Sequence, residues 1–150
     1  MKRQTKAQKF NDFADAVYCI RQGKPPKRSG AKDGSIPTHP VVDVPDLTEA
    51  QVLTACKDWL KQHNIFHNRH DAGSFQNIHG QWGTYGIVNA GDIIGILSNG
   101  IHFEIECKRG RGGRLSIGQQ KRMRDVRATN GLYFVVHGIN ELEHYMKDSV

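Results

Sequence analysis

Two carboxylates and a lysine near the middle of the sequence have the types and spacing that phosphodiester hydrolysis needs. Asp92 begins one apolar segment, and Glu106 and Lys108 lie two residues apart near the end of the next. Hydrolysis of a phosphodiester needs a divalent cation, an activated water and positive charge to offset the negative charge that develops. Mg²⁺ and Mn²⁺ prefer carboxylates, carbonyls and water as ligands. We therefore expect the two acids to bind such a cation and Lys108 to orient the attacking water or the phosphate.

The apolar pattern around these residues predicts two strands joined by a tight turn. Residues 92–97 and 101–108 have the composition of strands, and Ser98-Asn99-Gly100 between them is typical of a hairpin turn. Side chains alternate along a strand, so Glu106 and Lys108 are expected on one face, and the opposite face is expected to be apolar. The apolar face comprises Ile101, Phe103, Ile105 and Cys107.

An acid followed two residues later by a lysine is not a specific pattern by itself. Such a pair is more often a solvated strand face that carries a cross-strand ion pair. Here it is accompanied by Asp92 on the preceding strand, an apolar opposite face, a basic glycine-rich loop at residues 109–114 and a capped helix after that loop. The combination favours a catalytic site over a surface ion pair.

Three elements are predicted between the N-terminal part and Asp92. A helix is predicted from a cap at Asp46 to about Asn64, with Glu49 as the partner of Asp46 in a capping box. A short strand is predicted at residues 65–68, and a glycine-rich hairpin or loop near the site at residues 71–90. The apolar face of the helix is formed by Val52, Leu53, Cys56, Trp59 and Leu60.

The C-terminal part is predicted to contain a helix, a strand and a short helix. Ser116 can cap a helix that runs to about Thr129, where Asn130-Gly131 ends it. Residues 132–137 form an apolar run typical of a buried strand, and residues 141–147 predict a last helix. The order of these elements predicts an α/β fold with a mixed central sheet flanked by helices.

The N-terminal part has a different character from the rest. Residues 5–22 predict an amphipathic basic helix, and residues 23–40 are rich in Gly, Pro, Lys and Ser, as linkers are. The chain is therefore divided into a helix at 1–22, a flexible linker at 23–45 and the main domain at 46–150. The helix either docks on the domain or serves as an arm for a partner or for DNA. Its apolar positions are Phe10, Phe13, Val17 and Ile20.

The positive charge of the chain is unevenly distributed. The net charge is +6, and residues 1–34 hold nine Lys and Arg against three Asp, whereas the remainder is balanced. Residues 108–127 hold eight basic residues and one acid. Both segments suit a polyanion, although a basic surface that only keeps the protein soluble has the same composition. In the glycine-rich loop, Arg109, Arg111 and Arg114 are the most plausible phosphate contacts.

Cysteine usage and hydropathy limit the class of protein. The three cysteines form no C-x-x-C pair, which argues against a disulfide framework or a cysteine zinc site and favours a reducing compartment. No apolar run approaches the roughly 20 residues that span a bilayer, and no signal sequence follows the basic N-terminus. A protein without a membrane partner, in a reducing compartment such as the cytoplasm, is expected.

Three motifs follow one another through the centre of the chain. They are Gly91-Asp92-Ile93-Ile94-Gly95, Phe103-Glu104-Ile105-Glu106-Cys107-Lys108 and Gly113-Arg114-Leu115-Ser116-Ile117-Gly118-Gln119. Together they resemble the PD-(D/E)xK nuclease superfamily, and more narrowly its VRR-NUC branch, the virus-type replication-repair nucleases. The resemblance covers about residues 46–137, and it implies a restriction-endonuclease-like core. Gly91 stands where the superfamily name implies proline, which removes no ligand.

The resemblance implies a role for each matching residue. Asp92 and Glu106 match the metal-binding acids, and Lys108 matches the catalytic lysine. Glu49 matches an acid of the first helix that approaches the metal, and Gln119 matches a glutamine that contacts water or phosphate. The cofactor is then Mg²⁺ or Mn²⁺, with the backbone carbonyl of Cys107 as a further ligand. The nucleic-acid contacts are expected from Arg109, Arg111, Arg114, Ser116 and Lys121.

Some of these side chains admit a second interpretation. Glu49 also fits a purely local capping box, and Gln119 could be an ordinary polar residue of a helix, with Gln120 as its rival. Glu104 could bind a second ion, although a salt bridge is the better interpretation. Trp82 and Tyr85 could stack on bases or pack in a hairpin or core. His63, His67 and His70 could form a zinc site, but polar loop histidines are favoured.

The resemblance implies a DNA endonuclease, a homodimer that prefers branched or flapped DNA, encoded by a phage and located in the bacterial host cytoplasm or nucleoid. Two alternatives stay open. A nucleic-acid-binding module could keep the fold without turnover, and a restriction-type enzyme could cut both strands at a specific sequence. Nothing in the sequence separates cutting at branches from cutting at a specific sequence.

Overall fold

The chain forms two compact units, Met1–Ser35 and Ile36–Val150, which are described separately. The computed structural model describes residues 6–23 and 33–149, with only the backbone of residues 7–12 and 15. In the first unit, α1 (Lys6–Arg21) confirms the predicted N-terminal helix. Residues 24–32 of the predicted linker and the first five residues of the basic tail lie outside the described residues.

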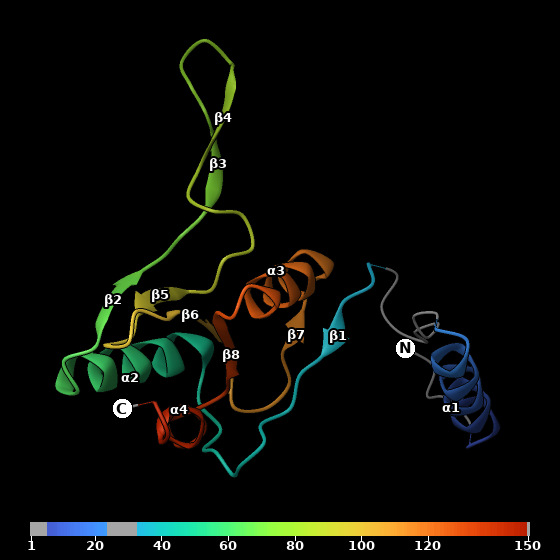
Figure 1. Cartoon of the computed structure of the whole chain (residues 1–150). Helices are drawn as coiled ribbons and strands as arrows, with labels where there is room; N and C mark the ends of the chain where they lie inside the picture. Colours follow the sequence, from blue (N-terminus) through green and yellow to red (C-terminus); the bar gives the residue numbers. More distant parts are fainter. Residues whose placement is uncertain (1–5, 24–32, 150) are drawn as a thin grey trace. The chain divides into compact units, whose positions relative to one another are not determined.

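A mixed four-stranded sheet is the centre of the second unit (Figure 1). Its strand order is β2-β5-β6-β8; β2, β5 and β6 are antiparallel neighbours, and β8 pairs in parallel with β6. Helices α2 and α4 cover one face, and α3 covers the other. The predicted α/β class, with a mixed sheet flanked by helices, is therefore confirmed. The strands are β2 (Phe66–Arg69), β5 (Ile93–Ile96), β6 (His102–Cys107) and β8 (Leu132–Val136), and the helices are α2 (Glu49–Gln62), α3 (Ile117–Ala128) and α4 (Ile139–Met146).

The predicted alternation along β6 separates a hydrophobic core from a polar face. Phe103, Ile105 and Cys107 are fully buried, and they pack in one cluster with the apolar residues of α2 and α4. Burial of each large side chain contributes about 2 kcal/mol, so this face fixes the register of β6. The residues between them are then directed to the α3 side of the sheet. The helical members of the cluster are Val52, Cys56, Trp59, Leu60, Leu142 and Met146.

The cap of α2 differs from the predicted one. Thr48 is the N-cap, its hydroxyl accepts from the backbone N–H of Gln51, and Gln51 completes the capping box. Asp46 lies before the helix, because Leu47 donates to the carbonyl of Pro45 and holds the chain in a turn there. The predicted box of Asp46 with Glu49 is therefore wrong. Glu49 is the first helical residue and has no capping role.

The second unit begins earlier than predicted. Residues 36–45, here called the strap, were assigned to a flexible linker, but β1 (Ile36–Pro37) pairs with β7 (Arg114–Leu115). The N–H of Thr38 donates to the carbonyl of Gly113, and its hydroxyl forms a hydrogen bond with Nε2 of His137. The N–H of Val41 donates to the carboxylate of Glu141. These partners lie up to 100 positions away in the chain, so local composition could not reveal them.

A two-stranded ribbon extends from the sheet between β2 and β5 (Figure 1). It consists of β3 (Gly73–Gln76) and β4 (Trp82–Tyr85), and it confirms the hairpin predicted within residues 71–90. Within the described part of the chain, no helix combines the length and the apolar character that crossing a membrane requires.

Candidate active site

The β5–β6 pairing brings the three predicted catalytic residues together on the polar face of the sheet. Ile93 is opposite Ile105, so the next pair along is Asp92 with Glu106, and opposite residues of an antiparallel pair share a face. The ammonium of Lys108 donates to Oε1 of Glu106 at 2.8 Å. Oδ2 of Asp92 accepts from the backbone N–H of Cys107 at 2.8 Å. The catalytic roles of these residues stay predictions, but their side chains converge.

Glu106 is held in an electrostatically unfavourable place. Its side chain is 4% exposed, and burial together with the negative charge of Asp92 raises its pKa to about 7. The ammonium of Lys108 opposes this shift without cancelling it, and Glu49 adds to it from the start of α2. The negative charges of Asp92 and Glu49 thus disfavour ionisation of Glu106, and a bound cation would offset this repulsion.

Gln119 links the start of α3 to the carboxylate of Glu106. Its amide nitrogen donates to Oε1 of Glu106 at 2.6 Å, while its amide oxygen accepts from the backbone N–H of Ser116. The side chain of Gln120 instead donates to the carbonyl of Leu115. The structure therefore selects Gln119 over Gln120 as the glutamine beside the site, and capping of α3 fixes its position.

The donor set around Asp92 and Glu106 fits a hard divalent cation. The N–H of Cys107 is directed toward β5, where it donates to Asp92. Its carbonyl points toward β5 as well, because the N–H and the C=O of one residue in a strand are directed to the same neighbouring strand. Two carboxylates, one carbonyl and water are ligands that Mg²⁺ accepts. No group of three or more His, Cys, Asp or Glu side chains among residues 6–23 and 33–149 is arranged to hold a metal. A cation here would depend on the carbonyl and on water.

The hydroxyl of Tyr133 is a buried polar group on the same face that the sequence did not single out. It has no hydrogen-bond partner within residues 6–23 and 33–149. Burial raises its pKa, and the charges of Glu106, Glu104 and Asp92 raise it further. Tyr133 lies opposite Glu104 in the β6–β8 pair. A buried donor without a partner beside carboxylates is suited to hold a water molecule. Its only sequence signal is one hydroxyl in an apolar run.

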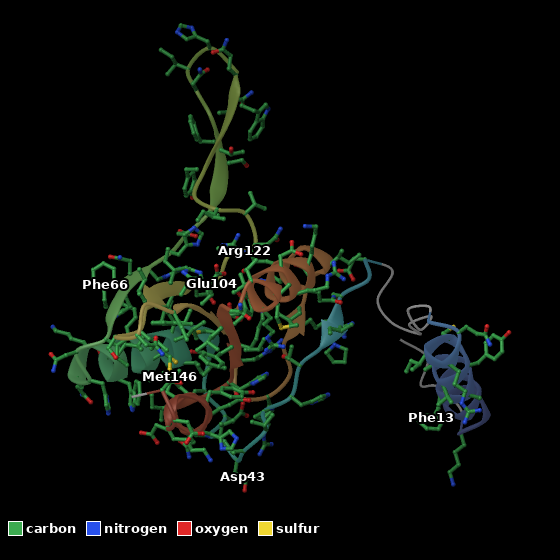
Figure 2. All side chains as sticks on the ribbon, in the orientation of Figure 1. Phe13, Asp43, Phe66, Glu104, Arg122 and Met146 are labelled. Carbon is green, nitrogen blue, oxygen red and sulfur yellow. The ribbon has the colours of Figure 1, made fainter. Side chains whose placement is uncertain are left out.

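Glu104 forms a salt bridge, as the sequence favoured, and does not contribute to the cation site. Arg122 of α3 donates to its Oε1 at 2.5 Å, and His102 approaches the same oxygen at 2.9 Å (Figure 2). Burial opposes ionisation, but these contacts and the N–H of Gly91 hold the pKa of Glu104 below its usual value. A proline at position 91 would lack that N–H, and any Cβ there would lie 2.8 Å from the carbonyl oxygen of Ile105, so glycine fits this position.

The predicted phosphate contacts differ in how they are placed. Arg109, Arg111 and Arg114 are exposed on the loop and short strand that follow Lys108. Lys121 is exposed on α3 and pairs with Asp125 at 2.6 Å. The hydroxyl of Ser116 accepts from the N–H of Gln119, so its first role is to cap α3. All three arginines are exposed, and DNA contact stays a prediction.

Arg69 is a second side chain that the sequence analysis missed. It ends β2, beside β5, and its guanidinium donates to the backbone carbonyl of Asp92 at 3.0 Å. The same nitrogen lies 3.8 Å from the carboxylate of Asp92. A partly exposed cation thus lies beside one of the proposed ligands. Only the pairing of β2 with β5 brings it there, and no local motif signals it.

The three histidines near β2 make separate contacts. His63 stacks on Trp59 and bonds to its carbonyl, and Nδ1 of His67 lies 2.7 Å from the carbonyl of Ile65. Nε2 of His70 accepts from the N–H of Ile87 at 2.9 Å, at the base of the ribbon. In the described residues, these rings do not share one metal site.

No protein-family model matches this sequence, and neither a curated protein nor a solved structure is significantly similar to the chain. The likeness of its motifs to PD-(D/E)xK nucleases therefore stays a prediction.

Proposed function

We propose that this protein is a metal-dependent endonuclease of the PD-(D/E)xK type, related to the VRR-NUC branch, that hydrolyses DNA phosphodiester bonds. The observation that supports it most is the convergence of Asp92, Glu106 and Lys108 on one sheet face, with the ammonium 2.8 Å from Glu106. A surface ion pair, the rival interpretation, would be exposed, whereas Glu106 and Lys108 are buried.

Each side chain has a role that follows from its contacts. Asp92, Glu106 and the carbonyl of Cys107 would hold Mg²⁺ or Mn²⁺, and Glu49 would add negative charge from α2. A bound cation supplies polarisation of the scissile phosphate and a water of lowered pKa. Lys108, fixed against Glu106, orients the attacking water and offsets the charge that develops.

The surrounding residues position these groups and the substrate. Gln119 holds the Glu106 carboxylate in one orientation through its 2.6 Å hydrogen bond. The exposed Arg109, Arg111 and Arg114 contact phosphates of the DNA on either side of the bond that is cut. Because one domain of this size carries one site, cutting both strands of a junction requires a homodimer.

The test is one panel of substrates, with linear duplex, single-stranded, flapped and four-way-junction DNA, each with Mg²⁺, Mn²⁺ or EDTA. Cleavage of branched substrates with either metal, and none with EDTA, is expected. Discrete fragments from linear duplex would indicate a restriction-type enzyme. DNA association that depends on salt, ignores the chelator and yields no product would indicate a binding module without turnover.

Three variants assign the residues. Asp92→Asn and Glu106→Ala should abolish cleavage and leave the fold and most DNA affinity intact. Asp125→Asn is the matched control, because Asp125 is an exposed acid of α3 that pairs with Lys121 at the surface. Unchanged turnover in Asp92→Asn would contradict the assigned metal site.

A further inference from the structure

The β3–β4 ribbon, residues 73–85, carries aromatic side chains that are exposed and do not pack in the core. Phe75 is 51% exposed, Trp82 is 72% exposed and Tyr85 is 49% exposed. The sequence left open whether the last two pack in the core, and these exposures exclude it. Exposed aromatic groups gathered on one element indicate a binding surface.

Two of the rings reach across the ribbon to a glycine of the neighbouring strand. Gly73 is opposite Tyr85, and Phe75 is opposite Gly83, so both rings are on one face, whereas Trp82, opposite Gln76, is on the other. A Cβ built on Gly73 would lie 2.6 Å from the hydroxyl oxygen of Tyr85, and one on Gly83 would lie 2.6 Å from Cζ of Phe75. Each ring therefore occupies the space beside a backbone glycine and stays about half exposed. A planar group can stack on such exposed rings.

The base of the ribbon is attached to the candidate active site. The N–H of His70 donates to the carbonyl of Asp92 at 2.8 Å, and Nε2 of His70 accepts from Ile87 on the returning strand. Asn89 packs where a side chain on Gly118 would otherwise lie, at the start of α3. A polymer that contacts Asp92 must therefore pass beside the ribbon.

The charge of the ribbon does not oppose a polyanion. Residues 72–91 contain no Asp, Glu, Lys or Arg. Phosphates are therefore neither repelled nor held there, and contact would depend on the aromatic rings. Nucleobases are planar, and each one stacked on an aromatic side chain strengthens binding.

We propose that the β3–β4 ribbon stacks on unpaired nucleobases through Phe75 and Tyr85, which share one face of the ribbon. The protein would thereby select nucleic acid whose bases are unpaired next to the phosphate at Asp92. This inference rests on the proposed nuclease function for the position of the strand, but stacking itself can be measured without cleavage.

The experiment measures binding in EDTA to three ligands: a single-stranded DNA, the same strand with abasic sites, and a duplex. Phe75→Trp puts a fluorescent ring at the proposed contact, and the wild type gives the background, because Trp59 is buried and Trp82 is on the opposite face of the ribbon. The single strand should quench the added fluorescence, and the abasic strand should not. An RNA strand of the same sequence shows whether the sugar is also recognised.

Variants identify the rings. Phe75→Ala and Tyr85→Ala should each weaken binding of the single strand about tenfold and leave binding of the abasic strand unchanged. Phe75→Trp should retain binding, which separates loss of a ring from loss of the ribbon's structure. Phe66→Ala is the matched control, because Phe66 is also an exposed aromatic residue, at 67%, but lies on β2 outside the ribbon.

Three results overturn the inference. One is that the ribbon variants weaken binding of the abasic strand as much as binding of the normal single strand. Another is that Phe66→Ala weakens binding of the single strand as much as Phe75→Ala does. A third is a fall in the molar mass of the protein in the ribbon variants without a change in DNA affinity, which would assign the ribbon to a second copy of the chain. The two proposals can fail separately. If the wild type cleaves DNA but the ribbon variants bind single-stranded DNA as tightly as it does, stacking is refuted and the nuclease function is not. If the ribbon stacks on bases but the protein cleaves nothing in Mg²⁺ or Mn²⁺, the nuclease function is refuted and stacking is not.

Discussion

Replacing Glu106 with glutamine tests whether the fold keeps an electrostatically disfavoured carboxylate at this position in order to bind a cation. Lys108 and Gln119 both donate to the same oxygen, Oε1. A glutamine with its carbonyl oxygen at that position keeps both hydrogen bonds and puts an amide nitrogen in place of Oε2. The substitution therefore removes the charge that Asp92 repels while it preserves the shape and the contacts of the side chain.

The expected effect on stability follows from the raised pKa. The folded protein holds a proton on Glu106 up to about pH 7, whereas the ordinary value is 4.5. Stability is therefore lost as the pH rises from 4.5 through 7, because the charged form is disfavoured in the fold. Each pKa unit corresponds to about 1.4 kcal/mol, so ionised Glu106 costs about 3 kcal/mol at pH 8. Since the side chain is almost fully buried, solvent screens little of this cost.

The assay is denaturant unfolding in EDTA near pH 5 and pH 8. Glu106→Gln should raise the free energy of unfolding by about 3 kcal/mol near pH 8 and by little near pH 5. Added Mg²⁺ or Mn²⁺ should stabilise the wild type and not the variant, because binding to the folded state stabilises it. Cleavage should be lost. The variant is thus expected to be more stable and inactive.

Glu104→Gln is the matched control, because its effect should have the opposite sign. Glu104 is buried and accepts from Arg122, His102 and the N–H of Gly91, so neutralising it weakens three hydrogen bonds and leaves the partly exposed guanidinium of Arg122 without its carboxylate. A loss of about 2 kcal/mol is expected, because hydrogen bonds to charged groups contribute about this much. A Glu106→Gln variant that is less stable than the wild type near pH 8, or that gains as much from Mg²⁺, would refute the reasoning.

Three further predictions concern the metal, the phosphate contacts and the N-terminal unit. In thermal-shift assays, the rise in Tm that Mg²⁺ causes in the wild type should be larger at pH 8 than at pH 6. A proton competes with the cation at Glu106, whose pKa is about 7. A rise in Tm that does not change with pH would contradict this. Arg109→Ala with Arg111→Ala should weaken binding of all DNA sequences and lower the slope of log affinity against log salt by about two; an unchanged slope in binding titrations would place the phosphates elsewhere. Deleting residues 1–34 removes the whole surplus of positive charge and leaves the strap intact. If the tail is a DNA arm, affinity falls and its salt dependence flattens, whereas equal binding would make the tail a structural or oligomerisation element.

The elements that carry the candidate site were predictable from the sequence, because their signals are local. The alternation of apolar and polar residues along β6 depends on next-nearest neighbours, and it put Glu106 and Lys108 on one face. The turn between β5 and β6 is short, so it determined that Asp92 meets Glu106. Ser116 and Gln119 are three positions apart, and their reciprocal hydrogen bonds start α3.

The tertiary structure alone decided which polar groups surround that site. Arg69 and Tyr133 reach the carboxylate face from β2 and β8, and only the order of the strands makes these its neighbours. Arg122 belongs to a basic segment, yet it turns inward because the buried Glu104 requires a cation. The strap belongs to the second unit because Val41 bonds to Glu141, 100 positions away. Local pattern determines which face a side chain takes, whereas hydrogen bonds between distant residues determine what it meets there.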